Sequence, residues 1–367
     1  MQIFTLPTGE GVYYYQKSIV IPFSGKRKVL STAHRNGGYS EELKAVFNHD
    51  AKPGAGMACT LRADTYQEHM KIITEELGLD PDYTAGITTA ASMENVAIKT
   101  VEYQNLSVTA IVTGGIEVNG GRVGDPTGWH EIDGKNHEIK PGTINIMLYI
   151  DGNMPPETLT RALVTCTEAK TAAIQELMLG SMYSRGLATG SGTDGSILIC
   201  NGESPDYYQF AGKHSKLGEL IGLAVKPAVK EALFLQTGAS PQLQFSILRR
   251  LQRFGVTMEK IWESFHENNA LYKPEFVCRL EKLDKEPELV VLTSLYAHLM
   301  DQLDWDLITM EQTAYEADHL LKRMNPKIQA VMVSDLVEKT KDEFIEAMTQ
   351  KMVGCLVGLL EERACIG

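Results

Sequence analysis

The chain has 367 residues, 43% of them hydrophobic and 22% charged, with a formal net charge of −12 at pH 7. This length exceeds a typical single domain, so two domains are expected. The acidic balance argues against nucleic acid as a partner, because phosphate binding requires clustered Lys and Arg. The six cysteines form no C-x-x-C pair, as is typical of reduced core thiols. With no signal peptide and no apolar run of ~18 residues, we expect a cytoplasmic protein without a membrane partner.

Hydrophobic periodicity predicts two kinds of structure along the first 240 residues. Strands are expected within residues 3–23, 96–116, 143–150 and 197–210, and the main helices over residues 40–48, 64–78, 155–180 and 216–236. Consecutive strands outnumber β-α-β alternations. The sequence therefore predicts an α+β fold, with a mixed or largely antiparallel sheet layered with helices, and an open α/β sheet is the alternative.

The sequence pattern changes at residues 238–241, Gly-Ala-Ser-Pro. Strand signals end there, and helical periodicity continues to the C-terminus. We therefore expect a first domain of residues 1–238 and an all-helical domain of residues 239–367, whose role the sequence does not indicate. If the protein forms a homo-oligomer, the helical domain is where we expect the contact.

Lys170 lies on the apolar stripe of the helix predicted over residues 155–180, seven residues after Leu163 and four before Ile174. Glu168, two residues away, points to roughly the opposite side at ~100° per residue, so the two charges should not pair. One interpretation is that Lys170 runs its alkyl stem over the core and lifts its ammonium to solvent. The other is that it serves a functional site.

Residues 188–194, Ala-Thr-Gly-Ser-Gly-Thr-Asp, form a loop rich in glycine and hydroxyl groups. Gly190, Gly192 and Gly195 spell G-x-G-x-x-G, but a helix precedes them and a strand follows, which is not the order of a dinucleotide site. The backbone N–H groups, the hydroxyls and Asp194 are instead suited to an anion or an amide carbonyl. A plain glycine-rich turn is the alternative.

His214 lies in Gly212-Lys213-His214-Ser215, after a strand predicted over residues 207–211 and before a helix. Free N–H groups at a helix start favour negative charge, so His214 is a candidate to meet a ligand. A surface capping residue is the alternative. We expect this segment, the Glu168 and Lys170 helix and the 188–194 loop to converge on one pocket.

Several further polar segments occur upstream, and each alone fits turn or strand-end chemistry. Together with the segments above, their order and spacing resemble the adenosylcobinamide amidohydrolase family of corrinoid salvage, the CbiZ family, over about residues 20–235. Ser191 departs from the family pattern, where threonine is expected. The matching segments are residues 31–38, 47–48, 86–91, 110–114, 143–146, 167–170, 188–194 and 211–219.

The resemblance implies hydrolysis of the amide that joins a corrin propionate side chain to aminopropanol, giving adenosylcobyric acid for cobalamin salvage. Amide hydrolysis requires a base, a donor for the oxyanion and an acid for the leaving amine. Asp194, Glu168 and His214 are the candidate acids and bases. Lys170, Asn36 and the N–H groups of residues 190–195 are the candidate donors.

A corrinoid carries many amides and wide flat faces, so its pocket should offer amide partners and aromatic rings. Tyr207 and Tyr208 are candidates for stacking. The candidate substrate-binding residues are Asn36, Gly37, Gly38, Asn48, Thr88, Thr89, Asn145, Thr189, Gly190, Ser191, Gly192 and Thr193.

We expect direct acid/base catalysis without a cofactor, because no H-E-x-x-H motif is present. A metal site would need His34, His49, Asp50, Asp194 and His214 to converge. Two other functions stay open: a non-catalytic corrinoid-binding or sensor protein, and an amidase for another small molecule on the same scaffold.

Overall fold

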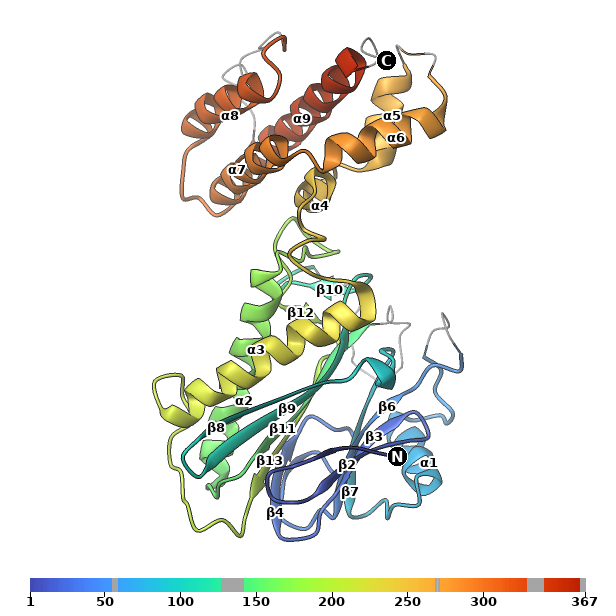
Figure 1. Cartoon of the computed structure of the whole chain (residues 1–367), viewed down its shortest axis with the longest axis vertical. Helices are drawn as coiled ribbons and strands as arrows, with labels where there is room; N and C mark the ends of the chain where they lie inside the picture. The colour runs from blue at the N-terminus through green and yellow to red at the C-terminus, as the bar shows by residue number, and fades with distance from the viewer. Residues whose placement is uncertain (55–58, 127–141, 268, 270, 329–339, 364–367) are drawn as a thin grey trace. The chain divides into compact units, whose positions relative to one another are not determined.

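The computed structural model describes residues 1–54, 59–126, 142–267, 269, 271–328 and 340–363. The chain divides into two compact units, Met1–Ser240 and Pro241–Gly367 (Figure 1). The described part of the first unit holds three β-sheets and three α-helices, and that of the second is helical.

The first sheet has five strands in the order β1-β2-β3-β6-β7. Its neighbours are antiparallel except for β6 and β7, which run parallel with Asn48 opposite Ile87. The strands are β1 (Gln2–Thr5), β2 (Gly11–Tyr15), β3 (Ser18–Pro22), β6 (Ala45–Asp50) and β7 (Thr84–Thr89).

The second sheet has six strands in the order β5-β4-β13-β11-β9-β8. Only β11 and β13 are parallel, with Asn145 opposite Gly195. The strands are β4 (Arg27–Ser31), β5 (Gly38–Ser40), β8 (Ala97–Tyr103), β9 (Leu106–Gly115), β11 (Thr143–Ile150) and β13 (Gly195–Asn201). A separate two-stranded sheet pairs β10 (Gly120–Gly121) with β12 (Gly190–Ser191). The predicted α+β class with mixed sheets is confirmed.

The first unit is a four-layer sandwich. One core lies between the two large sheets and includes Ile19 and Val46 from the first and Met147 and Ile197 from the second. The other face of the six-stranded sheet packs against α2 (Pro156–Glu176) and α3 (Lys216–Thr237), which cross each other in Figure 1. The outer face of the five-stranded sheet packs against α1 (Tyr66–Glu76). The layer order is therefore helix, sheet, sheet, helix.

This burial explains the composition of the central strand β11. All eight of its residues, Thr-Ile-Asn-Ile-Met-Leu-Tyr-Ile, are buried, because helices cover one face and the other sheet covers the second. Asn145 is thus a polar side chain in a strand without a solvent face, and it must find hydrogen-bond partners inside the protein.

The second unit consists of helices around a core of their own. Its buried Arg253 and Asp301 form a bidentate ion pair at 2.5 and 2.6 Å. The helices described are α4 (Ile247–Leu251), α5 (Met258–His266), α6 (Lys273–Asp284), α7 (Pro287–Asp304), α8 (Met310–Met324) and α9 (Lys341–Arg363).

Two sequence predictions are wrong in this fold. The helix expected over residues 40–48 is replaced there by the start of β6, because Val46 faces the core between the sheets while Phe47 faces α1, an alternation with period two. The strand expected over residues 207–211 is a single bridge between Tyr207 and Asn153. In addition, β7 lies where the sequence indicated only a strand end.

Candidate functional site

Asp194 immediately precedes β13, and its carboxylate accepts four hydrogen bonds. Oδ1 accepts from the backbone N of Ile144 at 2.9 Å and from Oγ of Ser191 at 2.7 Å. Oδ2 accepts from the backbone N of Ser191 at 3.1 Å and from the ammonium of Lys170. These four donors match the number of lone-pair sites on a carboxylate.

Lys170 reaches Asp194 from α2, and the two side chains are 11% and 14% exposed. The solvent-facing interpretation of Lys170 is therefore wrong. Glycine at position 190 permits the close approach, because a Cβ there would lie 2.1 Å from Oδ2 of Asp194 and 2.7 Å from Nζ of Lys170. The glycine-rich loop thus encloses a partly buried ion pair.

Hydroxyl groups tie the same loop to its neighbours. Oγ1 of Thr193 donates to the carbonyl of Gly142 at 3.0 Å and lies 2.5 Å from Oγ1 of Thr143. The carbonyl of Thr189 accepts from Oγ1 of Thr171 at 3.2 Å. Gly192 is exposed, with open space where a Cβ would be. Gly192 and Thr193 therefore present the accessible surface of the loop.

Asn145 links this loop to the five-stranded sheet. Its Nδ2 donates to Oδ1 of Asn48 at 2.7 Å and to the carbonyl of Thr88 at 2.9 Å, while its Oδ1 accepts from the backbone N of Gly195 at 3.1 Å. Asn48 in turn donates to Oγ1 of Thr113 at 2.8 Å. We use the term polar seam for this connected set: Asn48, Thr88, Thr113, Asn145, Lys170, Ser191 and Asp194.

The polar seam extends through Thr88 towards α1. The hydroxyl of Thr88 is hydrogen-bonded to the hydroxyl of Tyr66, and the rings of Tyr66 and His34 lie 4.3 Å apart. Burial raises the pKa of Tyr66 above its usual value, so its phenol stays protonated at neutral pH. Thr89 is 3% exposed, and its hydroxyl accepts from the backbone N of Ala91.

Asn36, Gly37 and Gly38 form the turn between β4 and β5. Asn36 has φ +54° and donates from Nδ2 to the carbonyls of Pro81 and Thr84 at 2.8 and 2.9 Å. Both of its amide hydrogens are thus used within the protein, which leaves its carbonyl oxygen for a ligand. A Cβ on Gly37 would lie 2.0 Å from the carbonyl oxygen of Ala33, so this turn requires glycine.

The expected convergence of His214 with Asp194 is not observed. His214 is exposed, and Ser215 and Lys216 lie beside Leu106, where β9 begins. The carboxylate of Asp194 accepts a hydrogen bond from the backbone N of Ile144, which pairs with Gly114 near the end of β9. At ~3.4 Å per residue the ten residues of β9 extend about 30 Å. The two groups therefore lie towards opposite ends of the strand.

Glu168 is likewise separate from the ion pair. It lies on the exposed face of α2 and pairs with Lys213 at 3.1 Å, with both side chains well exposed. The prediction that Glu168 and Lys170 do not pair with each other agrees with this geometry. Of the four candidate catalytic residues, the structure joins Lys170 and Asp194.

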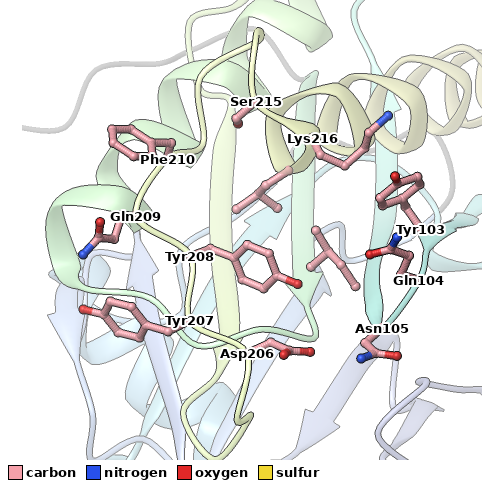
Figure 2. A pocket seen from close by; sticks show the side chains of 12 residues that line it. Tyr103, Gln104, Asn105, Asp206, Tyr207, Tyr208, Gln209, Phe210, Ser215 and Lys216 are labelled. Atoms are coloured by element: carbon pink, nitrogen blue, oxygen red, sulfur yellow. The ribbon is translucent and has the colours of Figure 1, made fainter.

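A pocket of about 570 Å³ opens at the start of β9 and of α3. Figure 2 shows Tyr208 and Tyr103 on opposite sides of it. The pocket is lined by Tyr103, Gln104, Asn105, Leu106, Asp206, Tyr207, Tyr208, Gln209, Phe210, Ser215, Lys216 and Leu217. None of the polar-seam residues lines it, so the two candidate sites are distinct.

The histidines near the polar seam do not assemble a metal site within the described residues, where no three His, Cys, Asp or Glu side chains gather. His49 faces α1, and a hydrogen bond of 2.8 Å joins its Nδ1 to Oγ of Ser18. Burial, reinforced by the positive charge of Lys17, lowers the pKa of His49 to about 4. His49 is therefore neutral at pH 7.

Two members of this neighbourhood were not predicted as site residues. Thr113 is one of three buried hydroxyl residues on β9, with Ser107 and Thr109, so its residue type alone does not single it out. Tyr66 begins α1 after the N-cap Thr65, and nothing local to the sequence indicates that its hydroxyl reaches Thr88 on another element.

The first unit, a four-layer sandwich that contains the polar seam, can now be compared with known proteins. The sequence profile of the adenosylcobinamide amidohydrolase (CbiZ) family matches residues 3–241, and the chain belongs to this family. The uncharacterized protein MJ1613 of Methanocaldococcus jannaschii is 34% identical in an alignment of 239 residues, which covers 62% of this chain and 89% of that protein.

Among solved structures, the PH0078 protein of Pyrococcus horikoshii aligns with a TM-score of 0.32 and 13% identity, over 70% of this chain and 92% of that one. In the described part of the chain, no helix is both long and apolar enough to cross a lipid bilayer.

Proposed function

We propose that this protein hydrolyses the amide bond between a corrin propionate side chain and aminopropanol in adenosylcobinamide, and that the reaction takes place at the polar seam. Family membership supports the reaction class. The observation that supports the location is the partly buried ion pair of Lys170 and Asp194 inside a loop of backbone N–H groups and hydroxyls. The product, adenosylcobyric acid, would serve cobalamin salvage in the cytoplasm.

In this proposal Asp194 is the general base. Its Oδ1 exchanges the hydrogen bond from Ser191 for one from a water molecule, and takes a proton from that water as the oxygen attacks the amide carbon. The ammonium of Lys170 and the loop N–H groups stabilise the negative charge that develops on the amide oxygen. Asp194 then returns the proton to the leaving nitrogen, the C–N bond breaks, and aminopropanol departs.

His214 and Glu168 were the other candidate acids and bases. Both are exposed and separated from Asp194, so neither is given a part in the proton transfer of this proposal. The residues that would contact the amide itself are Gly192 and Thr193, which form the accessible surface of the loop, and the half-buried Ser191 beside them.

A second function is supported by the same carboxylate. Asp194 already has four donors, and a carboxylate in this state serves equally to hold a loop in shape. A corrinoid-binding protein without turnover would need Asp194 only to hold the loop in shape. The two functions differ in whether aminopropanol is released.

The test is an assay of aminopropanol release from adenosylcobinamide by the full chain and by Asp194→Asn. This substitution is nearly isosteric and removes the base, but it also leaves the Lys170 ammonium without its counter-ion. Hydrolysis should fall by roughly 10² or more, and cooperative unfolding and corrinoid binding of the variant are measured with it to show that the loop is intact. Near-normal turnover in the variant would eliminate Asp194 as base. A shift of the visible corrinoid band without any aminopropanol release by the wild type would favour the binding protein.

A further inference from the structure

We propose that Asn145 is a positioning residue, which holds the backbone beside Asp194 in place, rather than a group that binds the substrate. This inference rests on the proposed function for its catalytic consequence. Its structural part stands on the hydrogen bonds of Asn145 alone.

The amide of Asn145 has no donor left for a ligand. Nδ2 carries two hydrogens, and both are used, one on Oδ1 of Asn48 and one on the carbonyl of Thr88. Its Oδ1 already accepts from Gly195, and the residue is 1% exposed. A substrate amide would have to displace one of these bonds inside the core, which leaves a buried polar group unpaired.

The hydrogen bond from Gly195 to Asn145 also fixes the position of the preceding residue, Asp194. Asn145 and Gly195 are opposite each other in the parallel pair of β11 and β13, and one peptide bond separates Gly195 from Asp194. A Cβ on Gly195 would lie 2.6 Å from Oδ1 of Asn145, so the glycine is needed for this contact. Asn145 therefore fixes where β13 begins, and with it the point from which the Asp194 side chain starts.

The other two bonds anchor Asn145 to the opposite sheet. Asn48 belongs to β6 and Thr88 to β7, and Asn48 is itself held by Thr113 of β9. The loop that carries Asp194 is thus tied through one side chain to strands of both large sheets. A displacement of about 1 Å in a catalytic group can lower a rate by roughly 10²-fold, so such an anchor should affect turnover more than binding.

The experiment compares Asn145→Ala with Thr109→Val in the full chain. Thr109 is also fully buried, on β9, and its hydroxyl bonds Thr100 instead of any polar-seam residue. Both substitutions remove buried side-chain hydrogen bonds. Only the first removes a bond to the segment that carries Asp194.

Three quantities are measured: kcat for aminopropanol release, corrinoid Kd from the visible band, and amide hydrogen exchange of the peptide covering residues 190–197. For Asn145→Ala we expect kcat to fall roughly 10- to 100-fold with Kd within about threefold. Exchange at residues 190–197 should rise on the order of tenfold. Thr109→Val should leave kcat, Kd and the exchange at residues 190–197 unchanged.

Two results would overturn the proposal. A weaker Kd with unchanged kcat would make Asn145 a substrate contact. Unchanged exchange at residues 190–197, or an equal rise in Thr109→Val, would show that Asn145 does not hold this segment specifically. If Asn145→Ala does not fold, Asn145→Ser, whose hydroxyl is too short to span the three partners, is measured instead. Absence of turnover in the wild type would contradict the proposed function, while the exchange measurement would still decide the role of Asn145.

Discussion

The ammonium of Lys170 and the carboxylate of Asp194 pair across 24 residues of sequence, and both side chains are largely withdrawn from water. Desolvation makes each charge expensive alone, so the pair is stable only while both members are present. Ser191 and Ile144 complete the carboxylate's partners and hold it towards α2. The loop shape and the charge balance therefore depend on each other.

Removing the cation should damage both folding and activity. Lys170→Met leaves an unpaired carboxylate, and we expect the free energy of unfolding to fall by about 3 kcal/mol. The measurement is urea unfolding at pH 7, followed by circular dichroism. Lys226→Met is the matched control, because Lys226 pairs with Glu176 on the exposed surface and such pairs contribute about 0 to 1 kcal/mol. Equal losses in the two variants would show that burial of the Lys170 pair has no energetic consequence.

The aromatic pocket at the start of β9 should not take part in the reaction. Tyr207 is 54% exposed there, so Tyr207→Ala is expected to leave the fold intact. If the chemistry occurs at Asp194, near the other end of β9, kcat/KM should stay within about threefold of the wild type. Steady-state assays of aminopropanol release test this. A large increase in corrinoid Kd would instead place part of the substrate in the pocket.

His49 should make stability depend on pH between about 4 and 6.5. Its folded pKa of about 4 lies below the ordinary value of 6.5, so the unfolded chain binds a proton that the folded chain does not. Stability is therefore fully present above pH 6.5 and is lost as the pH falls, by at most about 1.4 kcal/mol per pH unit. The groups that influence His49 are Lys17, Arg62, His69 and Glu76.

The check is the difference in unfolding free energy between the wild type and His49→Gln, measured from pH 4 to 7.5. His69 remains in both proteins, and burial lowers its pKa too, so the part of its contribution that does not depend on His49 cancels in the difference. The wild type should lose more stability than the variant on acidification. Parallel curves would show that His49 titrates normally in the folded state.

The first unit should fold and act without the helical unit. Residues 1–240 contain both large sheets, the complete polar seam and all but the last residue of the family match. We expect the fragment 1–240 to melt cooperatively and to retain aminopropanol release. A folded fragment without turnover, alongside an active full chain, would assign part of the site to residues 241–367.

Strong local patterns allowed much of this fold to be predicted from the sequence. The apolar run of β11, the Pro155-Pro156 start of α2 and the change at Pro241 each have a clear local cause. The segment of β6 was mistaken for a helix, because its strand character comes from burial between α1 and the other sheet, which is a tertiary effect.

The candidate site was predictable in composition but not in arrangement. The loop with Asp194 and the buried Lys170 could be identified from their residue types, and period 3.6 placed Lys170 on the inner face of α2. Which ends of the strands meet depends on topology. His214 and Asp194 are only 20 positions apart in the sequence, yet β13 and the segment after it carry them towards opposite ends of the sheet.

The hydrogen bonds of Asn48 also bear on how the chain finds its native strand pairing. Side chains alternate along β6, so a slip of one residue against β3 or β7 would turn Asn48 away from Asn145 and towards the apolar side chains of Met70 and Ile73 on α1. An amide without hydrogen-bond partners among those side chains would destabilise the misaligned pairing by about 1 to 3 kcal/mol. The residues that shape the site thereby also reject misaligned sheets during folding, and variants at Asn48 should yield more misfolded chains as well as less active ones.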